Sequence, residues 1–255
     1  MKTVILAGGL GTRLSEETEL KPKPLVEVGE YPILWHILKH YSWHGFNEFF
    51  VCLGYKGEAV KRFFLDRANL AGSMTIALKS GKVEGLDKEI EDWVLHLIDT
   101  GTSTQTGGRI KRMKPYINET FFMTYGDGVS NVDLRALLAH HKRCGKLATL
   151  TAVRPPARFG GIAFDGDNVA EFLEKPQAGE GWINGGFMVL EPAVFDYIGG
   201  DPSSFEAETL ELLCKEGQLA AYKHDDFWQC MDTLRDKRLL TGLWESGQAP
   251  WKTWS

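Results

Sequence analysis

Three glycines near the start of the chain stand directly behind a short apolar segment and in front of two cations. The apolar segment covers residues 3–7, and the polar set behind it is Gly8, Gly9, Gly11, Arg13 and Lys23. Glycines after a strand let backbone N–H groups approach an anion closely, and arginine and lysine add positive charge. These residue types at this spacing predict a loop that holds a triphosphate.

Two common phosphate-binding patterns do not match this loop. The pattern G-x-x-x-x-G-K-[ST] is absent, and G-x-G-x-x-G fails because Leu14 occupies its third glycine position. A dinucleotide cofactor is therefore disfavoured. A plain structural turn remains the alternative, although such a turn has no need of the two cations.

Two aspartates far apart in the chain are candidates for a divalent-metal site. Asp127 lies in TYGDGV, behind a very apolar strand, and Asp232 lies in FWQCMDT. Active sites of open α/β sheets gather at strand ends, and Mg²⁺ prefers one or two carboxylates completed by phosphate oxygens and water. Each aspartate could instead be an ordinary turn residue. Asp99, which also follows a strand, is a reserve candidate.

Strand-like and helix-like segments alternate along the chain and must position these side chains. Apolar runs predict strands at residues 3–7, 48–53, 74–78, 94–98, 121–125, 148–153 and 219–223. Apolar residues at helical spacing predict helices at residues 33–43, 58–68, 108–116, 132–144 (behind Asn131 as N-cap), 192–198, 207–216 and from 234. The order predicts an α/β fold, with a Rossmann-like, mainly parallel mixed sheet flanked by helices.

Beyond Pro155, short strands separated by glycine turns predict a small β elaboration in the second half, at residues 161–164, 169–174 and 185–190. We find no internal repeat and no low-complexity linker. We therefore expect one domain over residues 1–255, with a nucleotide-binding part at about 1–130 and a sugar-binding and carboxyl-terminal part at about 131–255.

Bulk composition excludes several classes of partner. The 255 residues are 43% hydrophobic and 25% charged, with a net charge of −5, which disfavours a nucleic-acid backbone as ligand. Apolar runs stay well short of the ~20 residues that span a bilayer. The four cysteines are scattered without a zinc-like spacing, which indicates reduced thiols and a cytoplasmic protein.

The segment LAGGLGTRL, with a Lys-Pro pair ten residues after its arginine, resembles the sugar-phosphate nucleotidyltransferases and their pattern GGxGTRLxPxT…PKP. Glu16 stands where that family commonly has proline. Within the family, RLSEET with KPKP is similar to the glucose-1-phosphate cytidylyltransferase branch. The resemblance continues through YGDGV, TGGRIKR, INGGF, WQCMDTLRDK and APWKTW, so it covers essentially the whole chain.

The resemblance implies that CMP is transferred from CTP to α-D-glucose 1-phosphate by direct in-line attack, giving CDP-glucose and pyrophosphate with Mg²⁺ as cofactor. It implies Arg13, Lys23 and Asp127 as catalytic residues and Asp127 with Asp232 as metal ligands. The implied nucleotide contacts are Leu6, Ala7, Gly8, Gly9, Leu10, Gly11, Thr12, Arg13, Lys23, Thr104, Arg109 and Gly126. The implied sugar-phosphate contacts are Tyr125, Glu174, Lys175, Asn184 and Gly185.

Several alternatives stay open on the sequence alone. The same chemistry could use another nucleotide or another phosphorylated acceptor, or the chain could be a non-catalytic nucleotide-binding regulator. The family further implies a homo-oligomer that serves O-antigen-type lipopolysaccharide synthesis, and no membrane partner. His36, His40 and His44 form a stripe that we interpret as a helix face or an interface rather than a metal site.

Two further features have more than one interpretation. The tail APWKTW either caps the core or forms a subunit contact. The carboxylates of SEET, Glu16 and Glu17, stand beside the predicted triphosphate loop, and we expect them to pair with Arg13 or Lys21.

Overall fold

The computed structural model describes residues 1–19, 21–85, 90–155, 161–165, 168–173 and 181–254. Seven strands form the main sheet, in the spatial order β14 (Leu219–His224), β10 (Ala148–Val153), β13 (Ile183–Leu190), β8 (Phe121–Tyr125), β1 (Lys2–Leu6), β4 (Glu48–Leu53) and β7 (Val94–Asp99). Strand β13 is antiparallel to both its neighbours, β8 and β10, and the other pairs are parallel. The predicted mainly parallel mixed sheet is therefore confirmed.

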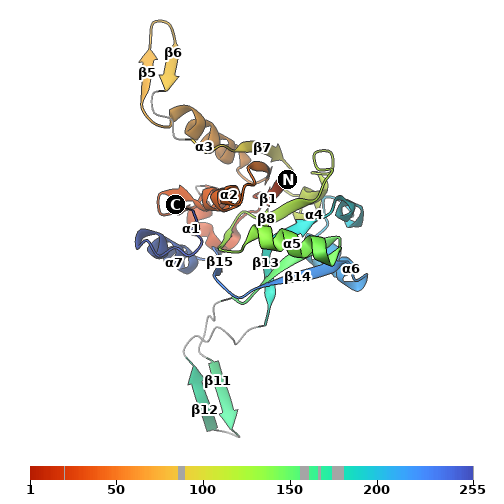
Figure 1. The fold of residues 1–255 in the computed structure, drawn as a ribbon. Helices are drawn as coiled ribbons and strands as arrows, with labels where there is room; N and C mark the ends of the chain where they lie inside the picture. The colour runs from red at the N-terminus through yellow and green to blue at the C-terminus, as the bar shows by residue number, and fades with distance from the viewer. Residues whose placement is uncertain (20, 86–89, 156–160, 166–167, 174–180, 255) are drawn as a thin grey trace.

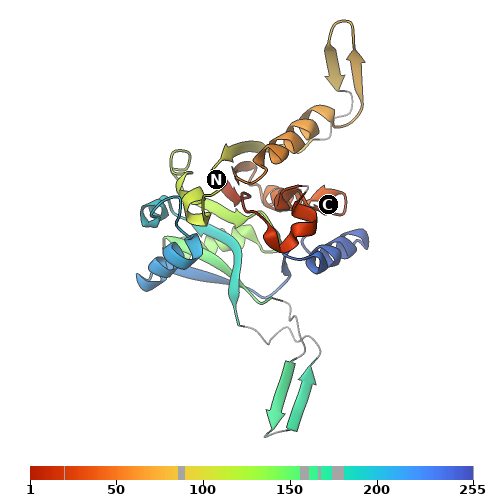
Figure 2. The same cartoon turned by 180° about the vertical axis from the view of Figure 1, so that it is seen from behind.

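The central strands are mostly apolar because both faces of the sheet are covered (Figures 1 and 2). Alternate residues of β1 contribute to two separate cores: Val4 and Leu6 to one, Ile5 to the other. The Ile5 core takes in residues of α2 (Ile33–Trp43), α3 (Gly57–Leu70), α5 (Leu134–Cys144) and α7 (Leu234–Glu245). The Val4 core takes in residues of α4 (Thr106–Lys111), η3 (Pro192–Tyr197), η4 (Phe205–Leu210) and α6 (Glu211–Lys215), or their immediate neighbours.

Several short elements connect the sheet to the helices. They are η1 (Thr12–Leu14), α1 (Ser15–Thr18), η2 (Lys23–Leu25), β2 (Glu27–Val28), β3 (Tyr31–Pro32), β9 (Gly128–Ser130) and β15 (Trp228–Cys230). Strand β15 pairs antiparallel with β9, so that Cys230 lies opposite Gly128. The sequence analysis did not predict this ladder, because three-residue strands leave no periodic signal. The ladder brings residues about 100 positions apart to one side of the sheet.

Two β-hairpins project away from the body of the molecule in both views (Figures 1 and 2). One joins β5 (Met74–Ala77) and β6 (Lys82–Gly85), and the other joins β11 (Gly161–Asp165) and β12 (Asn168–Leu173). The second hairpin confirms two of the three strands of the β elaboration predicted beyond Pro155, whereas the third, 185–190, is part of β13 in the main sheet.

Some predicted boundaries are wrong, for local reasons. Helix α5 begins at Leu134, and its N-cap is Asp133, whose carboxylate accepts hydrogen bonds from two backbone N–H groups at 2.9 Å. Asn131, the predicted cap, instead contacts a ring nitrogen of His224 at 3.0 Å. The helix predicted at 108–116 is Thr106–Lys111, 192–198 is a 3₁₀ helix, and 207–216 divides into a π-helix and a short α-helix.

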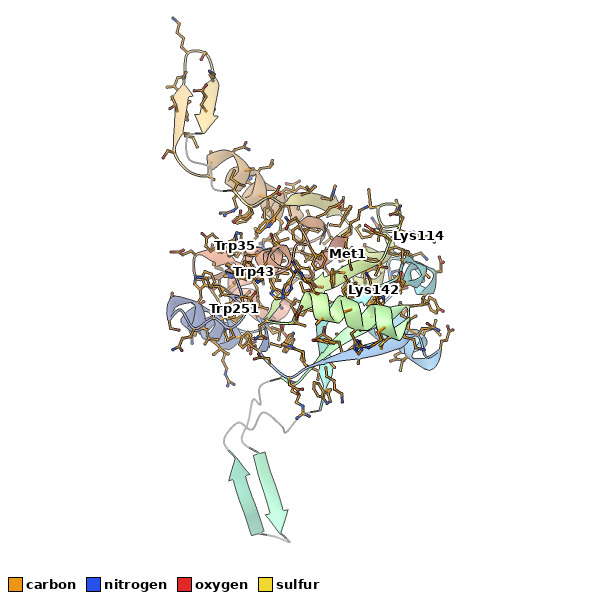
Figure 3. All side chains as sticks on the ribbon, in the orientation of Figure 1. Met1, Trp35, Trp43, Lys114, Lys142 and Trp251 are labelled. Carbon is orange, nitrogen blue, oxygen red and sulfur yellow. The ribbon has the colours of Figure 1, made fainter. Side chains whose placement is uncertain are left out.

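The tryptophan-rich tail folds back onto the core beside α2. Trp251 is fully buried and Trp254 is 7% exposed, and Figure 3 labels Trp251 close to Trp35 of α2. Trp251 Nε1 donates a hydrogen bond to His36 Nδ1 at 3.3 Å. The interpretation of the tail as a core cap is confirmed. His36 and His40 are buried core residues too, and burial lowers their pKa values to about 4 and about 3.

Candidate functional site

A cavity of about 460 Å³ opens at the carboxyl ends of β1 and β8. Its lining contains most of the predicted nucleotide-binding residues, namely Leu6, Ala7, Gly8, Gly9, Leu10, Gly11, Thr12, Lys23, Thr104, Arg109 and Gly126, together with the predicted metal ligand Asp127 and with Tyr125. Carboxyl ends of parallel strands are where open α/β sheets bind ligands, because the loops that follow diverge there. The cavity is therefore the candidate functional site.

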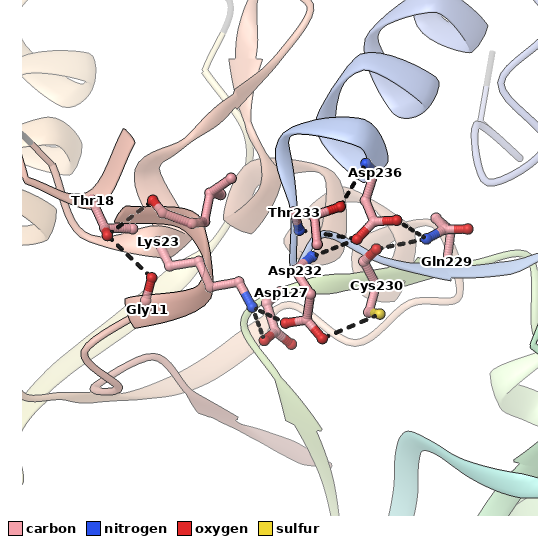
Figure 4. A network of polar contacts seen from close by, with 10 residues as sticks. Gly11, Thr18, Lys23, Asp127, Gln229, Cys230, Asp232, Thr233 and Asp236 are labelled. Carbon is pink, nitrogen blue, oxygen red and sulfur yellow. Dashed lines mark hydrogen bonds and ion pairs between the residues drawn. The ribbon is translucent and has the colours of Figure 1, made fainter. Parts of the chain in front are cut away.

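The glycine loop is closed on itself by a threonine of the SEET segment. Gly11 has a φ of +66°, a conformation that side chains with a Cβ rarely adopt. Thr18 Oγ1 donates to Gly11 O at 3.1 Å and to Leu14 O at 3.0 Å, as Figure 4 shows. The loop and the short helix α1 therefore form one braced turn, which ends at η2 and delivers Lys23 to the cavity.

Lys23 lies between the two predicted metal aspartates. Its Nζ donates to Asp127 Oδ2 at 2.7 Å and to Asp232 Oδ1 at 2.6 Å (Figure 4), and its side chain is 10% exposed. Burial alone would lower the pKa of Lys23, but the charges and hydrogen bonds of Asp127 and Asp232 outweigh it and raise the pKa. The cavity therefore holds a permanently charged ammonium group against two carboxylates.

Both aspartates are positioned by backbone structure. Asp127 follows β8 in the turn before β9, and its carbonyl oxygen accepts from Met231 N at 2.8 Å. Asp232 follows β15, and its backbone N donates to the Asp236 carboxylate at 3.1 Å. Asp236 also forms a capping box with Thr233 at the start of α7. The β9–β15 ladder and this cap together set the two carboxylates beside each other.

The donor set around Lys23 fits a magnesium ion. The oxygens of Asp127 and Asp232 that contact the same ammonium group are less than two hydrogen-bond lengths apart. Within the described residues, no cluster of three or more His, Cys, Asp or Glu side chains has the arrangement of a metal site. Two carboxylates suit Mg²⁺ with phosphate oxygens and water as its other ligands. The pair therefore suits a metal that binds together with a triphosphate.

Arg109 braces the glycine loop through backbone carbonyls. Its guanidinium donates to Gly8 O and Leu53 O, both at 3.0 Å, and to Thr100 Oγ1 at 2.7 Å. Arg109 is only 4% exposed although it lines the cavity. The sequence predicted a nucleotide contact, which stays a prediction. The geometry adds that this side chain joins the ends of β1 and β4.

The predicted sugar-side residues lie next to Tyr125. Asn184 Oδ1 accepts from Gly186 N at 2.9 Å, and Gly185 O accepts from Trp228 Nε1 at 2.7 Å. Neither residue is part of the cavity lining, whereas Tyr125 is. Burial and then the nearby Glu206 carboxylate raise the pKa of Tyr125, so its hydroxyl stays protonated.

Some predicted residues fall outside the described part of the chain. Glu174 and Lys175 lie outside the described residues, and so does the side chain of Arg13. The reserve candidate, Asp99, is exposed at the end of β7, where its carboxylate accepts from Gly101 N at 2.9 Å. Asp99 therefore stabilises a turn and does not line the cavity.

The structure corrects the pairing expected for Glu17 of the SEET segment, which was with Arg13 or Lys21. Its carboxylate pairs with Lys237 of α7 at 2.5 Å, and Lys21 pairs with Glu27 at 2.9 Å. Lys237 lies one helical turn beyond Thr233, the N-cap of α7, and Asp232 directly precedes this N-cap. The ion pair therefore connects the loop that ends in Lys23 to the helix behind Asp232, a long-range contact that the sequence could not reveal.

The cavity also includes residues that the sequence analysis missed. They are Pro24, Thr102, Ser103, Gln105 and Thr106. Four of them belong to the hydroxyl-rich run between Asp99 and Arg109, from which only Thr104 was selected. That run is the signal that could have found them, since binding residues gather on loops that a rigid sheet positions.

A family comparison agrees with this site. The family model described as "Nucleotidyl transferase" matches residues 2–236. The chain therefore belongs to the nucleotidyl transferase family.

Individual proteins similar to this chain carry names of the same kind. The chain is 51% identical to the glucose-1-phosphate cytidylyltransferases of Salmonella typhi and Salmonella typhimurium, over 100% of this chain and 100% of each relative. A solved structure of HddC from Yersinia pseudotuberculosis complexed with GMP-PN matches with a TM-score of 0.70 and 22% identity, over 95% of this chain and 99% of that chain. The structural likeness supports the fold, and the two Salmonella relatives carry the name of one sugar-phosphate cytidylyltransferase activity.

Proposed function

We propose that this chain transfers CMP from CTP to α-D-glucose 1-phosphate, giving CDP-glucose and pyrophosphate. The observation that carries the proposal is the 51% identity, without a missing segment on either side, to glucose-1-phosphate cytidylyltransferase of Salmonella typhi. The cavity supports it with a glycine loop, a charged lysine and two carboxylates in contact with that lysine. Such a set suits a triphosphate substrate.

The proposed reaction is a single displacement at phosphorus. An oxygen of the sugar phosphate attacks the α-phosphorus of CTP in line. A new P–O bond forms there, the bond from the α-phosphorus to the bridging oxygen breaks, and its electron pair leaves with pyrophosphate. The attacking phosphate is already anionic, so no general base is needed, and catalysis consists of positioning and charge stabilisation.

The residues of this chain divide that work among them. The backbone N–H groups of the glycine loop and Arg13 hold the β- and γ-phosphates, and Lys23 stabilises charge that develops at the α-phosphate. Lys175 holds the attacking phosphate. The Cys230 thiol, whose pKa burial and neighbouring carboxylates raise to about 12, is a poor nucleophile, in keeping with direct transfer.

Magnesium is the proposed cofactor, with Asp127 and Asp232 as its protein ligands. When bound, Mg²⁺ neutralises triphosphate oxygens and polarises the attacked phosphorus. The two aspartates fit this role because both carboxylates lie at the same end of the β9–β15 ladder, where Gly128 pairs with Cys230, and both contact the same ammonium group.

The sugar side and the cellular setting complete the proposal. Tyr125, Asn184, Gly185 and Glu174 contact the sugar. Apart from Tyr125, these residues lie in the part after about residue 130, which binds sugar, and the part before it binds nucleotide. We further propose a homo-oligomer in the cytoplasm that serves O-antigen-type lipopolysaccharide synthesis. Free thiols at all four cysteines support a reducing compartment. Within the described residues, no helix combines the length and apolar content needed to span a bilayer.

Pyrophosphate release over a matrix of nucleotides and sugar phosphates tests the proposal. We expect turnover with Mg²⁺, CTP and glucose 1-phosphate to exceed turnover with ATP, GTP, UTP or dTTP, and with mannose or galactose 1-phosphate. If the enzyme turns over another nucleotide and sugar phosphate but not CTP with glucose 1-phosphate, the proposed substrates are wrong. Nucleotide binding without turnover of any pair would make the chain a regulator instead.

A further inference from the structure

We propose that Glu206 is a positioning residue that fixes the nucleotide-side wall and the sugar-side wall of the cavity relative to each other. Glu206 lies in η4, which the comparisons and the sequence motifs leave without a role. The inference rests on the proposed function, because it names which side of the cavity serves which substrate.

The side chain of Glu206 accepts hydrogen bonds from both walls. Tyr125 Oη donates to its Oε1 at 2.5 Å, and Thr106 Oγ1 donates to its Oε2 at 2.6 Å. Ser204 Oγ also donates to Oε2, at 3.1 Å. Hydrogen bonds from hydroxyls to a carboxylate are short and roughly twice as strong as bonds between neutral groups. Glu206 is thus held firmly and holds its partners firmly.

Each partner stands at the end of a cavity-lining segment. Tyr125 is the last residue of β8, lies opposite Leu6 of β1 and precedes the Gly126–Asp127 turn. Thr106 is the first residue of α4 and follows the lining residues Thr104 and Gln105. The two segments come from different parts of the sheet, and the Glu206 carboxylate joins them directly.

The Tyr125 ring has little freedom once this bond is made. Gly186 has a φ of +80°, and a Cβ built there would lie 2.4 Å from Tyr125 Cδ2, so the ring packs directly on the β13 backbone. On the other wall, Thr106 Oγ1 accepts from Phe205 N at 3.0 Å, which leaves its proton for Glu206. Both hydroxyls are therefore oriented by their surroundings toward one carboxylate.

The backbone around Glu206 is shaped to present it. Residues Phe205–Leu210 form a π-helix, a rare widened turn that is found frequently at functional sites. Ser204 caps it by accepting from Ala207 N at 3.2 Å, and Phe205 is fully buried in the core. A carboxylate on a capped turn that the buried Phe205 anchors in the core can set the distance between two walls.

Steady-state kinetics of matched variants test the role. Glu206→Gln removes the charge and cannot accept all three bonds, so we expect the KM values for CTP and for glucose 1-phosphate both to rise about tenfold. Tyr125→Phe should raise chiefly the KM for glucose 1-phosphate, and Thr106→Val chiefly that for CTP. Glu208→Gln is the control: Glu208 is exposed in the same π-helix, and the amide can still accept from Ser204 N.

The double variants decide whether the groups act as a unit. Glu206→Gln combined with Tyr125→Phe should be no worse for glucose 1-phosphate than Glu206→Gln alone, because contacting residues are non-additive. The proposal is rejected if the double variant multiplies the effects of the two single variants on the KM for glucose 1-phosphate. It is also rejected if the KM values of Glu206→Gln stay within twofold of wild type. If Glu206→Gln does not fold, Thr106→Val with Tyr125→Phe decides it: effects on both KM values beyond the two singles support the link, and each substrate affected only by its own variant rejects it.

The wild-type enzyme separates this inference from the proposed function. If wild type turns over a different nucleotide and acceptor, the substrates assigned above are wrong, and the Glu206 variants are scored on the pair it does use. If wild type turns over no pair, calorimetric affinities for CTP are compared instead. A CTP affinity of Glu206→Gln equal to that of wild type then overturns the positioning role.

Discussion

Two buried ionisable side chains, Lys23 beside the cavity and His36 in α2, are kept in opposite charge states. Lys23 is 8% exposed and contacts two carboxylates, which raise its pKa. His36 is fully buried, accepts from Trp251 Nε1 and contacts the carbonyl oxygen of Val28 at 2.9 Å, and burial lowers its pKa to about 4. Burial removes the charge of one group, and opposite charges retain the charge of the other.

The candidate site and the core differ in the partners that surround their ionisable side chains. The histidines of α2 lie among aromatic rings, with the His36 and Trp244 ring centroids 4.6 Å apart, and the Nε2 atoms of His36 and His40 contact the uncharged carbonyl oxygens of Val28 and Val132. Lys23, Asp127 and Asp232 bring three formal charges together at an open cavity. Such a charged cluster is suited to binding phosphate and metal, whereas the packed aromatic region stabilises the fold.

Asp127→Asn should have the largest effect on activity and little effect on stability. We expect a roughly thousandfold loss of kcat/KM, since a bound metal stabilises the transition state by several kcal/mol. Urea unfolding should change by about 1 kcal/mol or less, because Asp232 still pairs with Lys23. Pyrophosphate release and urea titration measure both. Asp99→Asn is the matched control and should be near wild type, and equal losses in the two variants would refute the metal assignment.

Trp251→Ala should show the reverse pattern. The side chain is fully buried against Phe227 and Trp244, so we expect a loss of about 4 kcal/mol in the free energy of unfolding. The kinetic constants at a temperature where the variant is folded should stay within twofold. Trp43→Ala, at a position 52% exposed, should cost less than about 0.5 kcal/mol. A Trp251→Ala enzyme that is stable but inactive would break the separation between the two regions.

His36 should make the aromatic region sensitive to acid. The folded-state pKa of about 4 lies below the ordinary 6.5, so the contribution of His36 to stability is present above pH 6.5 and is lost as the pH falls toward 4. The loss amounts to about 3 kcal/mol. Urea titrations from pH 7 to pH 4 should show a shallower decline for His36→Gln than for wild type. His140→Gln, on a solvent-accessible helix face, is the control, and parallel declines in all three proteins would contradict the assignment.

Glu17→Gln should have the smallest effect. The Glu17–Lys237 pair is partly exposed, at 24% for each side chain, so we expect a loss of less than about 1 kcal/mol in stability. Because the pair ties the Lys23 loop to α7, the KM for CTP should rise by about threefold or less, and the effect should fade at high salt. Glu19→Gln is the control for a general charge effect. A rise of similar size there would show that the ion pair has no specific part.

Local patterns predicted the loop and the sheet because their signals lie in contiguous residues. Gly8, Gly9 and Gly11 follow an apolar strand, and Asp127 follows another, so both had to reach the same edge of a parallel sheet. Thr18 belongs to the family pattern GGxGTRLxPxT, but its role in closing the loop was not visible, because a sequence pattern does not show which backbone carbonyls its hydroxyl contacts.

Contiguous residues alone predict the α/β class, the glycine loop that leads to Lys23 and the strand end that carries Asp127, but they leave two interpretations of the tryptophan-rich tail. Three contacts follow from the fold alone: Asp232 meets Asp127 and Lys23 at the β9–β15 ladder, Glu17 pairs with Lys237, and Glu206 joins two walls of the cavity. The physical reason is sequence separation. Strand and helix periodicities report which face of an element is apolar, whereas contacts across 80 to 220 residues depend on how whole layers pack.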